Sequence, residues 1–362
     1  MNPAELKHWI AFTRVPYIGT VRLRLLEKHF GELSGAWSAS EGDLREAGLD
    51  ERATRSVLRH RNRIDPDAEL ALLERHSCSA ITWNDSEYPA RLKEIDDAPP
   101  VLYIRGELLP KDERSVAVVG TRRVTAYGRE VTHRLSTDLA KSDVVVVSGL
   151  ASGVDGIAHR AALEAGGRTV AVLGNGVDIV YPHQHAGLAE QIVENGAIIS
   201  EHPIGTKPKA EHFPRRNRIL SGITLGTLVI EAAESSGALI TARHALDQNR
   251  EVFAVPGSIL SPGSRGTNAL IQRMEAKPVH KHEDILEELN LSFVGAQIEM
   301  AALFPANDDE SKVLFHLSQE PTHIDEVIRG SGMTISVVSS LLAMMELRGL
   351  VRQVGGMNYV RV

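Results

Sequence analysis

Apolar residues recur at helical spacing near the start of the chain, over residues 6–12, 21–30 and 53–58. This pattern predicts a small helical domain over residues 1–64. Residues 16–19, Pro-Tyr-Ile-Gly, interrupt it, and Thr20 is placed to start the next helix. Such a turn is typical of a SAM-like or helix-hairpin-helix domain, in which amides at a helix N-terminus hold a phosphate. A helical domain that only packs against its neighbour explains the same pattern.

Uninterrupted apolar runs of strand length replace the helical pattern further along. They cover residues 116–119, 144–147, 170–173, 197–199, 228–230 and 252–255, with segments long enough for helices between them. Two strand-like segments, 80–83 and 101–104, come before these runs. Continuous apolar strands are buried on both faces, so residues 65–292 are predicted to form an α/β domain with a mainly parallel sheet. Ligands bind such sheets outside the carboxyl ends of the strands.

Residues 307–362 form a third predicted domain. Helical apolar stripes over residues 311–317, 323–328 and 335–348 come before two strand-like segments, 349–354 and 357–360. Three helices followed by a hairpin are the order of a winged helix. The domain has 5 basic and 7 acidic residues, which favours contact with a protein over tight binding of duplex DNA. Residues 293–306 are the predicted linker.

Composition narrows the classes of function. The 40 Lys and Arg residues against 47 Asp and Glu give a net charge of −7, which argues against a polycation that coats nucleic acid or anionic membranes. The single cysteine, Cys78, excludes an intrachain disulfide framework and a Cys-rich zinc site. No secretion signal and no run of about 18 apolar residues occur. We expect a cytoplasmic protein with no membrane partner.

The first buried run ends in a candidate anion site. Gly120, Thr121, Arg122 and Arg123 follow it and precede a predicted helix. Glycine permits close backbone approach, a helix N-terminus attracts anions, and arginine offers a planar donor fork for phosphate. In the alternative interpretation, Gly120 only turns the chain and the arginines are solvated.

A glycine-rich stretch follows the second run, at residues 148–156, SGLASGVDG. Its backbone amides form a second candidate phosphate cradle. The spacing is neither the dinucleotide G-x-G-x-x-G pattern nor a Walker motif. Asp155 is equally well placed to cap the next helix, and His159 is expected to be a packed helix residue.

The third run leads to Gly174, Gly176 and Asp178, and then to His183 and His185. The two histidines lack a third ligand at suitable spacing. No Ser/His/Asp constellation, H-E-x-x-H motif or cysteine pair occurs either. We therefore expect no metal, no cofactor and no catalytic residues.

A basic segment with one aromatic residue spans residues 205–218. It holds five basic residues and one acidic residue, and Phe213 stands among polar and charged neighbours. Stacking of an unpaired base on an aromatic ring contributes about 1–3 kcal/mol, while cations hold the backbone. In the alternative interpretation Phe213 anchors a helix in the core. Beside two candidate phosphate sites, the segment favours nucleic acid.

Several long motifs, in this order, resemble those of the bacterial DNA-processing protein A family, DprA or Smf. They are VGTRRVTAYG, SGLASGVDGIAH, AVLGNGVDIVYP, SEHPIGTKPKAEHFPRRNRILSG, SGALITARHAL, and VPG followed by GTNALI. They cover residues 116 to about 272, and the flanking domains also match the family's larger members. The resemblance implies an extended Rossmann-like domain that binds single-stranded DNA, forms a homodimer and helps to load the recombinase RecA during natural transformation.

The resemblance also implies which residues contact DNA. By matching position these are Gly120, Thr121, Arg122 and Arg123, then Ser148, Gly149, Ala151, Ser152 and Gly153, then Lys209, Phe213, Arg216 and Asn217. One departure concerns the family's Gly-Ala shortly after GTN-x-LI. Here Ile271 is followed by Gln-Arg-Met-Glu-Ala, which puts the end of that helix in doubt.

Two alternatives stay open. The first is a nucleotide-processing hydrolase related to the phosphoribohydrolases, whose P-G-G-x-G-T-x-x-E motif joins phosphate amides to a catalytic carboxylate. In this chain Ser258 follows Pro256 and Gly257, and position 270 is leucine. In the second, the winged helix binds DNA and the sheet is only a scaffold. The negative charge of the winged helix argues against this alternative.

Overall fold

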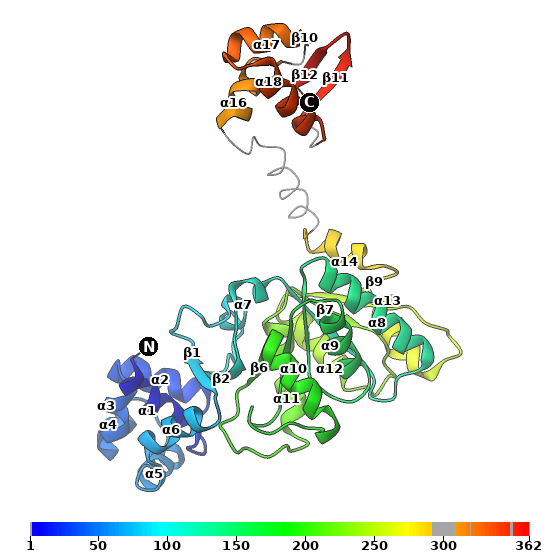
Figure 1. Ribbon diagram of the computed structural model, residues 1–362. Helices are drawn as coiled ribbons and strands as arrows, with labels where there is room; N and C mark the ends of the chain where they lie inside the picture. Colours follow the sequence, from blue (N-terminus) through cyan, green and yellow to red (C-terminus); the bar gives the residue numbers. More distant parts are fainter. Residues whose placement is uncertain (1, 292–307, 319, 348–349, 362) are drawn as a thin grey trace. The chain divides into compact units, whose positions relative to one another are not determined.

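The computed structural model describes residues 2–291, 308–318, 320–347 and 350–361 (Figure 1). The chain divides into two compact units, Met1–Ile285 and Leu286–Val362. Separate hydrophobic cores lie in the two units. The linker predicted over residues 293–306 lies outside the described residues.

Short helices form the N-terminal part of the first unit. They are α1 (Pro3–Thr13), α2 (Thr20–Phe30), α3 (Leu33–Ser38), α4 (Glu41–Glu46), α5 (Glu51–His60) and α6 (Pro66–Arg75). The helices predicted at 6–12, 21–30 and 53–58 are confirmed as α1, α2 and α5. Ser40 and Asp43 form a capping box at α4, and the Asp50 side chain caps α5, so polar side chains satisfy amides that the helices leave unpaired.

The predicted boundary after residue 64 falls between α5 and α6, and the hydrophobic core continues across it. Trp9 of α1 packs edge-on against Trp83, with ring centres 5.5 Å apart. The Thr13 hydroxyl lies 2.8 Å from the hydroxyl of buried Tyr103. The N-terminal helices therefore pack directly on one edge of the sheet.

A nine-stranded sheet forms the centre of the first unit in the described part of the chain. Its strands run in the order β1 (Ser79–Thr82), β2 (Val101–Gly106), β6 (Gly196–Ser200), β5 (Thr169–Val172), β4 (Val145–Ser148), β3 (Ser115–Val119), β7 (Gly226–Val229), β8 (Glu251–Ala254) and β9 (Lys277–Pro278). β2 pairs antiparallel with β1 and β6, and the other pairings are parallel. The predicted α/β fold with a mainly parallel sheet is confirmed. β9 was missed because two residues make no apolar run.

Helices follow most of the strands along the chain and cover the sheet (Figure 1). They are α7 (Ala90–Lys93), α8 (Ala126–Lys141), α9 (Val154–Glu164), α10 (Ala186–Asn195), α11 (His212–Gly222), α12 (Ala238–Asp247), α13 (Arg265–Gln272) and α14 (His282–Glu288). α13 ends at Gln272, where the sequence departs from the family pattern, and Met274 then adopts a left-handed backbone with φ 57°.

The second unit has the winged-helix order. Its helices are α16 (Asp308–Phe315), α17 (Ile324–Ser331) and α18 (Ile335–Leu347), and its strands are β10 (Thr322–His323), β11 (Val351–Gly355) and β12 (Asn358–Arg361). Three helices and a hairpin are confirmed, whereas β10, which pairs with β12, was not predicted. Across the described ranges no single helix is long and apolar enough to cross a membrane. One pair bent by 114°, Ile324–Ser331 with Ile335–Glu346, passes by length and composition only.

Candidate functional site

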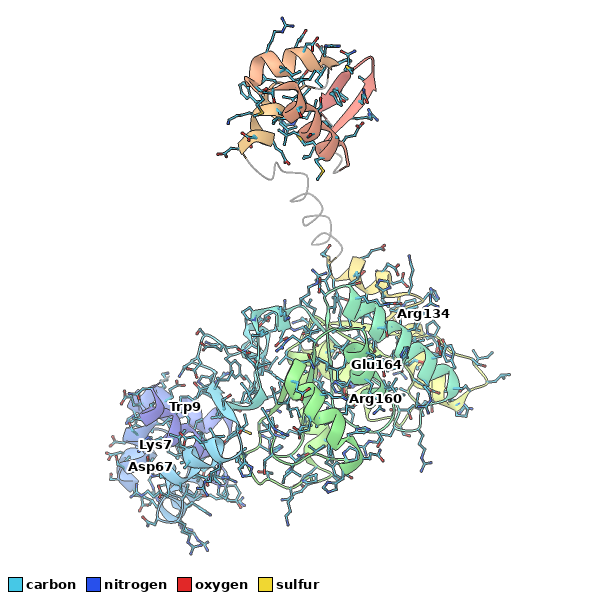
Figure 2. All side chains as sticks on the ribbon, in the orientation of Figure 1. Lys7, Trp9, Asp67, Arg134, Arg160 and Glu164 are labelled. Carbon is cyan, nitrogen blue, oxygen red and sulfur yellow. The ribbon has the colours of Figure 1, made fainter. Side chains whose placement is uncertain are left out.

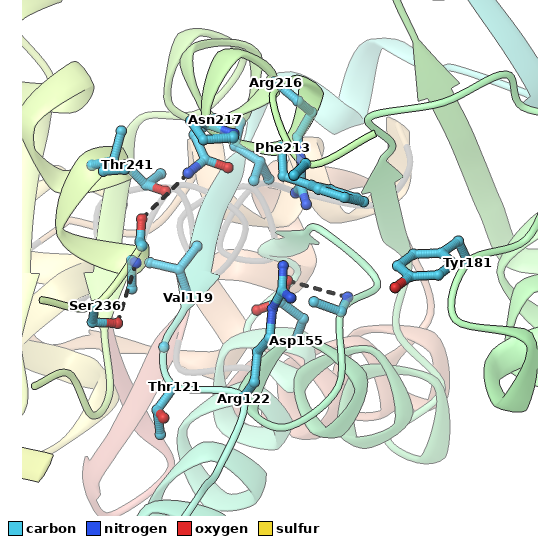
Figure 3. Close-up of a pocket in the computed structure, with 18 of the residues that line it drawn as sticks. Val119, Thr121, Arg122, Asp155, Tyr181, Phe213, Arg216, Asn217, Ser236 and Thr241 are labelled. Carbon is cyan, nitrogen blue, oxygen red and sulfur yellow. Dashed lines mark hydrogen bonds between the residues drawn. The ribbon is translucent and has the colours of Figure 1, made fainter. Parts of the chain in front are cut away.

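A cavity of about 560 Å³ lies beyond the carboxyl ends of the parallel strands (Figure 3). Its lining comes from the segments that follow β3, β4, β5, β6 and β7 and from α11. This is the edge at which parallel α/β sheets bind ligands.

The cavity brings together seven of the predicted site residues. These are Gly120, Thr121, Arg122, Ala151, Phe213, Arg216 and Asn217. The other six surround it without lining it: Arg123, Ser148, Gly149, Ser152, Gly153 and Lys209. Segments separated by almost 100 residues along the chain therefore meet in one place.

Two aromatic rings and one exposed cation define the open side of the cavity. The ring centres of Tyr181 and Phe213 lie 5.7 Å apart at an angle of 31°. The Arg122 guanidinium carbon lies 5.6 Å from the centre of the Phe213 ring, and the side chain extends toward both rings (Figure 3). Phe213 is half-buried and faces the cavity, so it is not a core anchor. It lies inside α11, which begins one residue earlier, at His212.

A second cation, Arg216, is buried beneath this surface. Its side chain is 4% exposed, and one amino group donates to the Gly149 carbonyl at 3.2 Å. Within the described residues its other two nitrogens have no hydrogen-bond partner. Burial lowers the pKa of the Arg216 guanidinium to about 10, partly offset by Asp155, so Arg216 remains charged at neutral pH. Buried positive charge acts more strongly on a nearby anion than charge in water.

Gly149 is required by the position of Arg216. A Cβ at residue 149 would lie 1.7 Å from a guanidinium nitrogen of Arg216, far inside van der Waals contact. The glycine therefore acts by allowing the arginine to approach the backbone.

Asp155 changes the role predicted for the glycine-rich stretch. Its carboxylate accepts from the amides of Gly149 at 3.2 Å and Ala151 at 3.3 Å. These two amides hold a side chain and so differ from the free phosphate cradle that was predicted. Asp155 does not cap α9 either, since the N-cap residue is Gly153. Burial raises the pKa of the Asp155 carboxyl, and Arg216 opposes that shift.

Glycine also lets the first two loops pack against each other. Gly153 has φ 83°, and a Cβ there would lie 2.3 Å from the carbonyl oxygen of Thr121. That carbonyl accepts from the Val154 amide at 3.3 Å. Ser148 is buried and donates to the Val118 carbonyl at 2.6 Å. These residues fix the Arg122 loop in place, and they do not face the cavity.

Not all of the basic residues in residues 205–218 are available to bind an anion. Lys207 and Lys209 are exposed on either side of Pro208, which lines the cavity. Arg218 instead lies 2.8 Å from both Glu201 and Asp97, and its side chain is 3% exposed. Burial opposes ionisation of Glu201, but Arg218 holds the pKa of that carboxyl below its usual range. Arg218 therefore stabilises the fold.

Several lining residues were not predicted as site residues. Tyr181 follows β5, and residues 236–241 lead into α12 after β7. Both segments follow the carboxyl ends of strands in the same sheet, and this position in the sequence could have predicted that they line the site. Tyr181 also shares with Phe213 its position beside a proline and polar residues.

The histidines near the site have structural roles. His159 is buried, as expected, with its ring nitrogen 2.7 Å from the Thr169 hydroxyl, and burial lowers the pKa of His159 to about 3. His185 lies 2.9 Å from the Leu150 carbonyl. No group of three or more His, Cys, Asp or Glu residues suited to a metal occurs in the ranges that the structure covers.

Comparisons with family models, curated proteins and solved structures all point to the same family. The model of the family DNA recombination-mediator protein A matches residues 79–290, and a DprA winged helix domain model matches residues 298–357. Protein Smf from Synechocystis sp. is 36% identical over 397 residues, covering 100% of both chains. The X-ray structure of DNA processing protein A from Streptococcus pneumoniae has a TM-score of 0.68 at 34% identity and covers 80% of this chain and 98% of that one. A structure of DNA processing protein A from Helicobacter pylori, described for its single-stranded DNA binding mode, has a TM-score of 0.53 at 30% identity, with coverage of 59% and 95%.

Proposed function

Because the chain belongs to the DNA recombination-mediator protein A family, we propose that the cavity beside Arg122 and Phe213 binds single-stranded DNA. The observation that supports this most is the grouping of two aromatic rings with one exposed and one buried arginine. Unpaired bases stack on aromatic rings, and arginines hold the phosphates between them. A duplex keeps its bases stacked on one another, so its bases cannot use these rings.

The proposed role is binding without bond-breaking chemistry. Among the cavity residues Asp155 is the one carboxylate, and two backbone amides already engage it. Such a carboxylate suits the support of a loop better than general-base catalysis, which needs an oxygen that reaches the substrate.

We further propose that the bound strand is protected and passed to RecA during natural transformation in the cytoplasm, and that the protein acts as a homodimer through its Rossmann-like domain. Exposed apolar side chains away from the cavity support partner contacts there. Ile259 and Leu260 are each 86% exposed and Met274 is 92% exposed. Ile259 and Leu260 are adjacent in the chain, and adjoining exposed apolar side chains are typical of protein contacts.

The DNA-binding proposal is tested by fluorescence anisotropy with a labelled oligothymidylate at several salt concentrations. Arg122→Ala should weaken binding about 10- to 100-fold and lower the salt slope by about 0.7, since one phosphate contact is lost. Phe213→Ala should weaken binding about 10-fold with little change in slope, because stacking releases no counterions.

Arg134→Ala is the matched control, since Arg134 is an exposed arginine on α8 that does not line the cavity. Equal affinity and equal salt slope for wild type and Arg122→Ala would show that DNA does not bind here.

A further inference from the structure

A second cavity, of about 350 Å³, lies where the N-terminal helices meet the sheet. Its lining includes Tyr17 and Gly19 from the turn between α1 and α2, together with His202 and Arg215. All of these residues belong to the first compact unit. The proposed DNA site does not include this cavity, although His202 and Arg215 belong to one of the family motifs, residues 200–222.

The start of α11 separates the two cavities. Arg216 lines the first cavity, and its neighbour Arg215 lines the second. The ring of His212, beside Phe213 in the chain, stacks on the His202 ring with centres 4.2 Å apart. Burial lowers the pKa of His202 to about 4, so the His202 ring is neutral at physiological pH. A chain that leaves the first cavity over α11 reaches the second directly.

Tyr17 is held in a strained conformation at the mouth of the second cavity. Its φ is 68°, in the left-handed region that non-glycine residues rarely adopt. Arg22 donates to the Tyr17 carbonyl at 2.7 Å, and Ser56 donates to the Pro16 carbonyl at 2.7 Å. Residues held in the left-handed region by their surroundings occur often at ligand sites.

The Tyr17 ring is presented together with cations. The Arg52 guanidinium carbon lies 3.8 Å from the ring centre, and its amino group donates to the Tyr17 hydroxyl at 2.6 Å. Tyr17 nevertheless remains 48% exposed. The Arg215 side chain is 63% exposed, and its nearest carboxylate oxygen, on Glu201, is 3.8 Å away. Glu201 is already paired more closely with Arg218, at 2.8 Å. Most of the Arg215 charge is therefore available to a ligand.

We propose that the second cavity is a further nucleotide subsite of the same DNA path. A single strand with a base at Phe213 continues over α11, places a phosphate at Arg215 and stacks a further base on Tyr17. The chemistry repeats that of the first cavity, in which an aromatic ring lies beside an exposed arginine. This inference rests on the proposed function, and it gives the N-terminal helical domain a direct part in binding.

The test compares two oligothymidylates in anisotropy titrations of the full chain. One has about 5 nucleotides, enough for the first cavity, and the other about 20, longer than the roughly 4–16 nucleotides that a single-strand binding domain such as an OB fold covers. Tyr17→Asn removes the ring and keeps a residue type that tolerates the left-handed region. Arg215→Ala removes the charge without touching that turn. We expect each variant to bind the long strand about 10-fold more weakly and the short strand as wild type does.

Arg134→Ala serves as the matched control, because Arg134 is an exposed arginine on α8, far from the labelled residues of the N-terminal helices (Figure 2). Wild-type affinity of both variants for the long strand, with Arg122→Ala still weakened, would overturn the second subsite and leave the first intact. An equal loss for both lengths would assign these residues to the first cavity, and that also contradicts the second subsite. Failure of the wild type to bind either strand would overturn the proposed function itself.

Discussion

The cavity of the first unit and the helices of the winged-helix unit differ in the charge at their helix N-termini. α11 and α12, whose first turns line the cavity, have no acidic residue in those turns, and Asp155 in the first turn of α9 is already held by two backbone amides. α16 begins with Asp308, Asp309 and Glu310, and α17 with Asp325 and Glu326. The positive N-terminal ends of the cavity helices are therefore free to attract anions, whereas carboxylates neutralise those of α16 and α17.

The same contrast holds for the element that reads DNA in many winged helices. The third helix, α18, contains no Lys or Arg within Ile335–Leu347, and its Ile335 and Met344 are exposed. Recognition helices use polar and basic side chains to reach base edges and phosphates. The comparison teaches that the fold of a domain does not by itself locate a DNA site, and for this reason the proposed site depends on aromatic rings beside cations.

The largest effect is expected from removing both parts of the first cavity's open surface. The Arg122→Ala, Phe213→Ala double variant should bind single-stranded DNA about 100- to 1000-fold more weakly, because the two single losses multiply when the phosphate contact and the stacking contact are independent. Anisotropy titration measures this loss, and thermal melting provides the control that the fold is retained. A loss below tenfold would move the DNA site away from this cavity.

Acid is expected to destabilise the first unit through His159. Its folded-state pKa is about 3 against an ordinary value of 6.5, so the unfolded chain takes up the proton first as the pH falls. The stability that His159 contributes is complete above pH 6.5 and should decrease by about 2 kcal/mol by pH 5.

Urea unfolding of wild type and His159→Gln at pH 7 and pH 5 measures this difference. His133→Gln, at an exposed position of α8, controls for histidine loss in general. The same pH dependence in wild type and His159→Gln would contradict the assignment.

Gly149→Ala is expected to weaken DNA binding about tenfold, because the new Cβ displaces the Arg216 guanidinium from its place under the rings. Gly187→Ala is the matched control, since a Cβ there meets nothing within 4 Å. Anisotropy titration of both variants separates a specific displacement from a general effect of added bulk. Unchanged binding by Gly149→Ala would show that Arg216 has no part in holding the strand.

Removal of residues 307–362 should have the smallest effect on DNA binding. Single-strand affinity should stay within about twofold of the full chain, because the cations of the cavity belong to the first unit. The same anisotropy assay measures it. A loss as large as that of Arg122→Ala would reverse the comparison and make the winged helix the DNA reader.

The sequence predicted the fold better than the site. Strands that are buried on both faces, such as β3 with five buried residues, have an uninterrupted apolar run that exposed elements lack. β9 and β10, of two residues each, have no such pattern. Arg218 shows why the site was harder. Its charge counted toward the basic segment, yet it pairs with Glu201, 17 residues away, and with Asp97, 121 residues away, and only the folded chain shows these contacts.

The role of Asp155 also depends on tertiary contacts that the sequence does not show. Its position before a helix fits a cap, and only the folded loop shows that its carboxylate accepts the Gly149 and Ala151 amides. Tyr181 joins Phe213 because β5 and α11 are neighbours in the fold. Local spacing therefore identified which loops matter, and tertiary packing decided which side chains in them face the cavity.

The central claim is tested most directly by titrating the full chain with labelled single-stranded and duplex oligonucleotides of equal length at two salt concentrations. We expect the single strand to bind at least about 10-fold more tightly at both concentrations, because only unpaired bases reach Phe213 and Tyr181. Equal affinity for the two, or a preference for the duplex, would contradict the account.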